Sequence, residues 1–281
     1  MQPRVRDALV SDLADIVRVA ALAGEDHEWA GGDERYLQHL LAHGQLVVAE
    51  EAAGLVGYAA TRTLEGPAFG CVMLCDLFVA PAVRGAGVGR ALLSALWHES
   101  SARMTFSSTH PAALPLYASF GLMAWWPLLY LIGEVSRLPA FPDCSASQVP
   151  AGEAAGLERE WTRVDRAADY VAWEARPGGA AFVVRRGDTA VATGVLGGEP
   201  LGLEHLRLAP AVDDDTADAA LCSALGCAGA DGPMRVRLPG SHPALPVLLA
   251  AGWRIEDHDL FMATRRDLLD PARDVPSPAL G

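Results

Sequence analysis

The sequence contains no lysine, so all 22 of its basic residues are arginines. Lysine therefore cannot act as a base or form a Schiff base, and a P-loop of the GK[ST] type is excluded. The 35 acidic residues leave a formal net charge of −13. This balance argues against nucleic acid as a partner, because polyphosphate needs a basic surface, and favours a neutral or cationic substrate.

Cysteine is scarce too, and long hydrophobic runs are missing. The five cysteines form no CxxC pair and no Cys/His cluster, so we expect neither a disulfide framework nor a metal site. No run approaches the ~18 apolar residues of a membrane helix, and the start of the sequence lacks the apolar centre of a signal peptide. We therefore expect a cytoplasmic protein with no membrane partner.

The N-terminal half alternates predicted strands and helices, as in a mixed α/β fold with hairpins. At 281 residues, 51% of them hydrophobic, the chain is long enough for about two domains and too apolar for disorder. Strands are expected at residues 45–49, 55–63, 71–79, 104–108 and 125–134, and helices at 9–22, 34–42, 111–120 and from the glycine-rich turn to about residue 99.

The C-terminal half repeats this pattern. Residues 77–96 align without a gap over residues 206–225, with ten of twenty positions identical, and THPAALPLYASFGL further along resembles SHPALPVLLAAGW. Two ordered matches at nearly equal offset predict a duplicated domain. We expect one domain at residues 1–137, a Pro/Ser-rich linker at 138–150, a second domain at 151–268 and a disordered tail at 269–281.

The motif RGAGVG, which starts at Arg84, follows an apolar strand and opens an amphipathic helix. Gly85, Gly87 and Gly89 remove side chains, so a ligand can approach the backbone closely. The free amides of the loop and of the first helical turn favour an anion, and Arg84 and Arg90 add positive charge. The motif predicts a cradle for a pyrophosphate, with a purely structural turn as the alternative.

The wider pattern resembles the acetyl-CoA-binding signature of the GNAT acyltransferase superfamily. The matching blocks are V-x-P-x-x-R-G-x-G-V-G at residues 79–89 and LYxxxG at 116–121. The resemblance covers residues 3–135, and about 150–266 as a degenerate copy. It implies an α/β (mixed α+β) fold of two tandem GNAT-like domains, each a mixed, mainly antiparallel sheet flanked by helices. A Rossmann fold would instead need GxGxxG early in the chain.

The resemblance implies an N-acetyltransferase that moves acetyl from acetyl-CoA to a primary amine of a small molecule by direct attack on the thioester. Residues 77–79 would pair with the pantetheine arm, residues 84–90 would bind the pyrophosphate, and Tyr117 would be the general acid for the departing thiolate. The implied cofactor-binding residues are Leu77, Phe78, Val79, Arg84, Gly85, Ala86, Gly87, Val88, Gly89, Arg90, His110, Ala113 and Tyr117. Tyr117 as an ordinary helix aromatic, and His110 as a helix-start residue repeated by His242, are the alternatives.

The general base is left open by the sequence. Many relatives carry Glu just before the Asp of this strand, where this chain has Cys75, and strand alternation predicts that Asp76 points to the opposite face. The acidic residues Glu25, Asp26 and Glu28 are candidates, as is a base acting through water or no base at all. The acidic cluster of residues 25–28 and 33–34 would form a substrate lid, with a solvated loop as the alternative. The residues that would add an aromatic wall for the acceptor are His27, Trp29 and Tyr36.

The second copy departs from the signature at the site itself. It has DDDTAD in place of RGAGVG and Leu248 in place of Tyr117, so it would repel a pyrophosphate and lacks the acid. We expect it to be a structural partner, which makes the chain a pseudo-dimer, either as a monomer or as a homodimer. A non-catalytic acyl-CoA-binding module, a protein N-acetyltransferase and a pure interaction protein are the competing functions.

Overall fold

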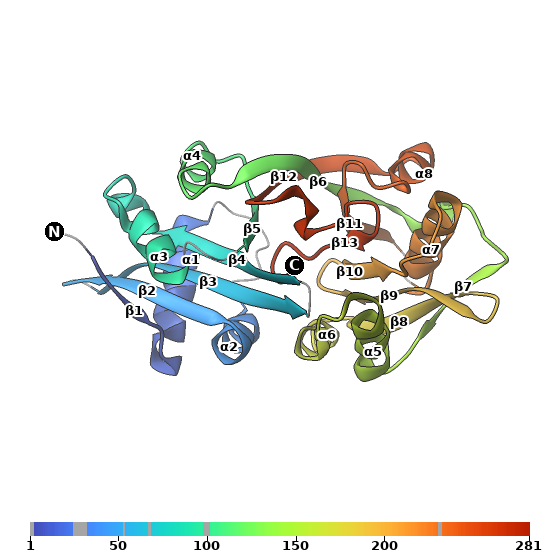
Figure 1. Ribbon diagram of the computed structural model, residues 1–281, viewed down its shortest axis with the longest axis horizontal. Coiled ribbons are helices and arrows are strands. Elements are labelled where there is room, and N and C mark those ends of the chain that lie inside the picture. The colour runs from blue at the N-terminus through green and yellow to red at the C-terminus, as the bar shows by residue number, and fades with distance from the viewer. Residues whose placement is uncertain (1–2, 25–32, 53, 67–68, 98–101, 230–231) are drawn as a thin grey trace.

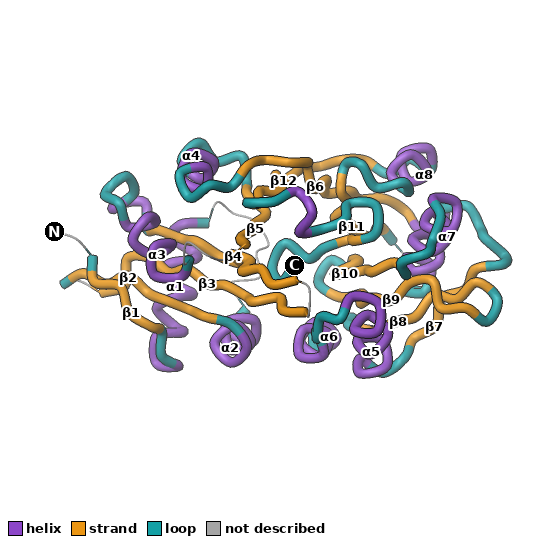
Figure 2. The backbone as a smooth tube through the Cα atoms, viewed as in Figure 1, coloured by secondary structure: helices purple, strands orange, loops and turns teal. Residues whose placement is uncertain are grey.

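The computed structural model describes residues 3–24, 33–52, 54–66, 69–97, 102–229 and 232–281. The chain forms two lobes side by side, each a twisted sheet with helices on its faces (Figures 1 and 2). The first half of the chain forms β1 (Arg4–Asp7), α1 (Leu13–Ala23), α2 (Glu34–His43), β2 (Gln45–Glu51), β3 (Gly54–Gly66), β4 (Phe69–Val79), α3 (Val88–Leu96), β5 (Ala102–Ser107), α4 (Ala113–Ala118) and β6 (Met123–Glu134).

The second half repeats this order of elements and ends in one additional short strand. It forms β7 (Cys144–Gln148), α5 (Ala151–Thr162), α6 (Ala167–Glu174), β8 (Ala180–Arg186), β9 (Thr189–Gly197), β10 (Gly202–Leu208), α7 (Asp214–Gly226), β11 (Pro233–Pro239), α8 (Leu245–Ala250), β12 (Arg254–Ala263) and β13 (Asp274–Val275). No helix in the described parts of the chain is long and apolar enough to cross a membrane.

All these strands belong to one continuous sheet with the order β1-β2-β3-β4-β5-β12-β6-β11-β10-β9-β8-β7, while β13 pairs with β10. Among the strands of the described residues, only two neighbouring pairs, β4–β5 and β10–β11, are parallel, and each lies in the middle of one half. The sheet is therefore mixed and mainly antiparallel, with helices on both faces, which confirms the predicted fold class.

The two halves exchange their last long strands. β12, from the second half, pairs with β5 and β6, and β6, from the first half, pairs with β11 and β12 (Figure 1). Phe261 of β12 is fully buried and stacks on Trp126 of β6 at a ring-centroid distance of 4.4 Å. At Gly133 of β6, an added Cβ would come within 2.3 Å of the Trp253 indole, so the strand passes very close to that ring. The sheet is therefore not divided where the sequence passes from the first half to the second.

Two segments that the composition suggested were irregular are ordered. The predicted linker contains β7, an edge strand that pairs with β8, and its serines suit a strand with one exposed edge. The predicted disordered tail packs into the molecule, with Val275 and Leu280 almost fully buried, and its last residues lie between the two lobes (Figure 1). A disordered tail is therefore wrong, because these apolar side chains and their backbone carbonyls have partners in both halves.

Candidate active site

The first half of the sheet opens between β4 and β5. The two strands pair from Cys71↔Ala102 to Leu74↔Thr105, and β4 then continues with no described strand on that side of residues 77–79. Leu77, Phe78 and Val79 are only partly buried. An extended ligand can add as a further strand on this side of β4, where no described strand lies.

The glycine-rich turn leads from β4 into α3. Gly85 and Gly87 have φ values of +80° and +88°, and a Cβ at either position would meet nothing within 4 Å. Gly87 is the N-cap of α3, so the first amides of the helix, beginning at Val88, lack intrahelical acceptors and point toward an exposed turn that includes Ala86. A Cβ at Gly89 would instead lie 3.2 Å from Leu116, so this glycine permits close packing of α3 on α4.

The two arginines of the turn have different environments. Arg84 donates to the carbonyls of Val79 at 3.2 Å and Ala23 at 2.7 Å, and so ties the turn to the end of β4 and to α1. Arg90 is exposed, with its guanidinium over the Phe120 ring at 5.6 Å. The cradle thus has one arginine that holds the loop and one that remains at the surface.

Tyr117 of α4 is buried on the α3 side of the sheet, with Trp97 and Leu122 in the same hydrophobic cluster. Burial raises the pKa of its hydroxyl, and the negative charges of Asp259 and Asp76 raise it further. The hydroxyl is therefore protonated at neutral pH, as a general acid must be before it acts. Asp259 comes from β12, so the second half contributes to the electrostatics of this site.

His110 starts the α4 segment in the way that His242 starts the α8 segment. The His110 Nδ1 accepts from the amide of Ala112 at 3.2 Å, and the His242 Nδ1 accepts from the amide of Ala244 at 3.1 Å. This shared geometry favours the helix-start interpretation of His110. Ala113, the first residue of α4, is half-buried.

A β-bulge changes the side-chain directions at the end of β4. Ala60 pairs with Asp76 and Thr61 pairs with Leu74, which leaves Cys75 as an extra residue in β4. The extra residue interrupts the alternation of side chains between the two faces of the sheet. Accordingly, Cys75 and Asp76 are both close enough to Tyr36 to raise the pKa of its hydroxyl. The prediction that Asp76 points away from the face of Cys75 is therefore wrong, because no local sequence signal marks the bulge.

Asp76 is a candidate functional residue that strand alternation had placed on the opposite face. Its side chain is almost fully buried, and its Oδ2 has no hydrogen-bond partner among the described residues. Burial raises the pKa of this carboxyl to about 8, while the nearby Tyr36 hydroxyl acts in the opposite direction. A buried carboxyl with a pKa near the working pH is suited to proton abstraction.

The other candidate residues near the acceptor divide into two groups. Glu25, Asp26, His27, Glu28 and Trp29 lie outside the described residues. Tyr36, on α2, is described, and its hydroxyl donates to the carbonyl of Ala279 at 3.1 Å. Burial raises the pKa of the Cys75 thiol well above its usual range, so this residue is a small apolar group rather than a thiolate.

The corresponding opening in the second half is filled by its own chain. There β10 and β11 pair only at Gly202↔Arg235 and Leu203↔Val236. β13 enters the gap and pairs antiparallel with β10. Its partners on β10, residues 206–207, align in sequence with residues 77–78 of β4. The strand edge that is open in the first half is therefore occupied in the second.

The aspartates that replace the glycine-rich turn have a structural role. The Asp213 carboxylate caps α7 by accepting from the amide of Thr216 at 2.9 Å. Leu248, at the position of Tyr117, is fully buried. The second half thus offers neither an anion cradle nor a hydroxyl for acid catalysis at these positions.

Residues 42–121 match the family described as the acetyltransferase (GNAT) domain. This span includes the glycine-rich turn, the opening between β4 and β5, and Tyr117. This part of the first half is therefore similar to the GNAT acetyltransferase domain. A comparison with curated protein sequences gives no significant match.

Solved structures match along nearly the whole chain. A putative acetyltransferase from Pyrococcus horikoshii has 14% identity and a TM-score of 0.75, with 100% of this chain and 96% of that chain covered. A tandem GNAT protein from the clavulanic acid biosynthesis pathway has 15% identity and a TM-score of 0.63, with coverage of 93% and 98%. A GCN5-related N-acetyltransferase from Sphaerobacter thermophilus has 14% identity and a TM-score of 0.60, with coverage of 99% and 98%. At these identities the matches establish the fold of the full chain.

Proposed function

We propose that the first half of the chain is an N-acetyltransferase that moves acetyl from acetyl-CoA to a primary amine of a small molecule. The observation that carries this proposal is the open edge of β4, which runs from the glycine turn to a buried carboxyl and a buried phenol. A pyrophosphate on the amides around Gly85 and Gly87 would let the pantetheine arm extend along residues 77–79 as an added strand. The thioester would then lie near Asp76 and Tyr117.

The reaction follows from this placement. The amine nitrogen attacks the thioester carbonyl carbon, the new C–N bond forms, and the C–S bond breaks. Asp76 accepts the proton that the amine loses, and Tyr117 gives its proton to the departing sulfur. Holding the two reactants in this geometry supplies a large part of the rate enhancement. The second half acts as a structural partner within one chain.

Titration calorimetry of the purified chain with acetyl-CoA is the first test. One site per chain is expected, because the second opening is occupied by β13 and its turn carries aspartates. Binding at two sites would contradict the assignment of a closed second half, and no binding would contradict the function itself. A panel of primary amines, followed by release of the CoA thiol, then tests turnover. The absence of lysine removes acetylation of the enzyme's own lysines as a background.

A non-catalytic acyl-CoA-binding module is the second candidate. It is favoured by Cys75, which stands where many relatives carry Glu. Tight acetyl-CoA binding without turnover of any amine would support this alternative, whereas amine-dependent thiol release would exclude it. A protein N-terminus or a lysine side chain as acceptor is distinguished by including short peptides in the same panel.

A further inference from the structure

Residues 277–281 lie on the face of the first-half sheet that is opposite to α3. Leu280 is almost fully buried in the cluster against which Tyr36 and Cys75 pack. Gly281 lies so close to β4 and β5 that an added Cβ would come within 2.8 Å of the Met73 sulfur and 3.6 Å of Met104. Met73 and Met104 pair with each other directly before the strands separate. The segment therefore covers the start of the opening, beside Cys75 and Asp76.

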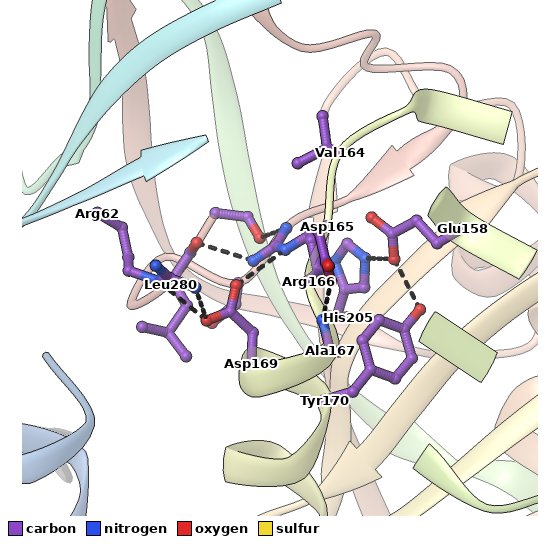
Figure 3. A network of polar contacts seen from close by, with 12 residues as sticks. Arg62, Glu158, Val164, Asp165, Arg166, Ala167, Asp169, Tyr170, His205 and Leu280 are labelled. Carbon is purple, nitrogen blue, oxygen red and sulfur yellow. Dashed lines mark hydrogen bonds and ion pairs between the residues drawn. The ribbon is translucent and has the colours of Figure 1, made fainter. Parts of the chain in front are cut away.

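Fixed hydrogen-bond donors from both halves hold the backbone of this segment. Arg166 donates to the carbonyls of Leu280 at 2.8 Å and Gly281 at 2.5 Å, and Tyr36 donates to that of Ala279. The Arg166 side chain is 5% exposed and is ion-paired with Asp169 at 3.2 Å (Figure 3). These donors are in place before any ligand arrives.

The donors are held by a buried network that spans the halves. Asp169 of α6 accepts from Arg62 of β3 at 2.7 Å (Figure 3). It also lies 2.8 Å from the Nε2 of His39 of α2. The three cationic or imidazole partners hold the pKa of the Asp169 carboxyl well below its usual range, although burial acts in the other direction. Arg166 therefore has a fixed position, and its donor groups would be unsatisfied if nothing replaced the segment.

A groove of about 600 Å³ opens between α2 and α6 directly over the segment. Ala279 and Leu280 form part of its wall, and Tyr36 lines it from α2. Its volume is in the range that encloses a small organic molecule. A ligand in this groove that displaced the segment would reach the face of the sheet that carries Asp76.

We propose that residues 277–281 occupy the acceptor subsite, and that the acceptor which replaces them is an amine bearing an amide or carboxylate oxygen, as in an amino acid or peptide. This inference rests on the proposed acetyltransferase function. The buried donors of Arg166 and the partly buried hydroxyl of Tyr36 require oxygen acceptors, and a plain alkyl amine would leave them unpaired at a substantial cost. The segment thus closes the subsite when the acceptor is absent.

The first experiment is deletion of residues 277–281, with alkylation of Cys75 by iodoacetamide located by mass spectrometry as a readout that needs no turnover. We expect at least a tenfold faster reaction at Cys75 and an unchanged rate at Cys227, a partly buried cysteine of the second half. The synthetic peptide Ser-Pro-Ala-Leu-Gly should restore protection. Unchanged labelling of Cys75 in the folded deletion variant would overturn the placement. Should the deletion not fold, Leu280→Ala gives the same test with a smaller expected increase.

The second experiment compares leucinamide with isoamylamine, which share the branched alkyl chain and amine and differ in the carboxamide group. We expect the deletion to lower the KM of leucinamide at least tenfold with an unchanged acetyl-CoA Kd, and the pentapeptide to compete with leucinamide. Equal kcat/KM for both amines would refute the acceptor class while leaving the acetyltransferase function intact. No acetyl-CoA binding in any variant would instead refute the proposed function, and the labelling result would still decide the position of the segment.

Discussion

Replacement of Asp76 by Asn is expected to stabilise the protein while it removes the proposed catalytic base. The folded protein raises the pKa of this carboxyl from 3.8 to about 8, so the folded state holds a proton that the unfolded state releases at neutral pH. Because the folded state binds more protons than the unfolded state, the free energy of unfolding decreases as the pH rises from about 4 to about 8. Asn has nearly the same shape as Asp and does not ionise, so the free energy of unfolding of the Asp76→Asn variant should not decrease in this way.

The size of the effect follows from the interval between the two pKa values. The difference between 3.8 and about 8 is about four pH units. Each unit corresponds to about 1.4 kcal/mol, so the advantage of the Asn variant should grow by up to about 4 kcal/mol between pH 5 and pH 8 and then level off. The carboxyl is only 3% exposed, so solvent screening reduces this figure little.

Urea unfolding of both proteins at several pH values between 5 and 9 measures this difference. Asp188→Asn, on an exposed turn of the second half, is the matched control and should show no such trend. In parallel, kcat/KM of the wild type should rise with pH to a plateau above about 8, and the Asp76→Asn variant should lose that dependence together with most of its turnover. A stability difference that is constant across this pH range would refute the reasoning.

Three further substitutions test other parts of the molecule. Tyr117→Phe should lower kcat by about 100-fold with an unchanged acetyl-CoA Kd, and wild-type turnover would exclude the acid role. Gly87→Asp should abolish acetyl-CoA binding measured by calorimetry, whereas Gly187→Asp, at a second open position with positive φ, should strain the backbone similarly and bind normally. Gly133→Ala should lower the free energy of unfolding by about 3 kcal/mol, because the new methyl would overlap a neighbouring indole; Gly152→Ala, with open space around it, is the control, and equal effects would contradict the packing argument.

The conformation of the glycine-rich turn was predictable from sequence because its signal is local. A strand, two glycines and an amphipathic helix follow one another within about twenty residues, and Gly85 and Gly87 have the positive φ values that such a turn uses. The loss of the glycine-rich turn in the second half was predictable for the same reason, since Asp214, Thr216 and Asp218 stand at the positions of Gly85, Gly87 and Gly89. Its closure by β13 was not, because the composition of residues 269–281 predicted a disordered tail.

The direction of the Asp76 side chain and the order of residues 277–281 were not predictable in the same way. A one-residue bulge at Cys75 turns Asp76 toward Tyr36, and the residue pattern of a bulged strand is the same as that of a regular one. The order of residues 277–281 depends on donors more than 100 positions away along the chain, such as Arg166 at 114 and 115 positions. The composition of this segment shows only that it is rich in proline, which does not indicate that it is ordered.

β11 is the counterpart of β5 in the second repeat. The duplicated sequence does not indicate which of these two strands pairs with β6 and which pairs with β12. β6 and β12 occupy equivalent places in the two repeats, so pairing within a half and pairing between halves satisfy the same local pattern. Only the three-dimensional arrangement distinguishes the two.

The exchange of β6 and β12 has a consequence for how such a gene can change. Each half completes the sheet of the other, so a shortened gene that encodes only the first copy would leave β5 without the strand beside it. Substitutions can therefore erase the chemistry of the second copy one residue at a time, while loss of that copy as a whole removes part of the first domain. The second copy is therefore retained because β12 is part of the first half's sheet.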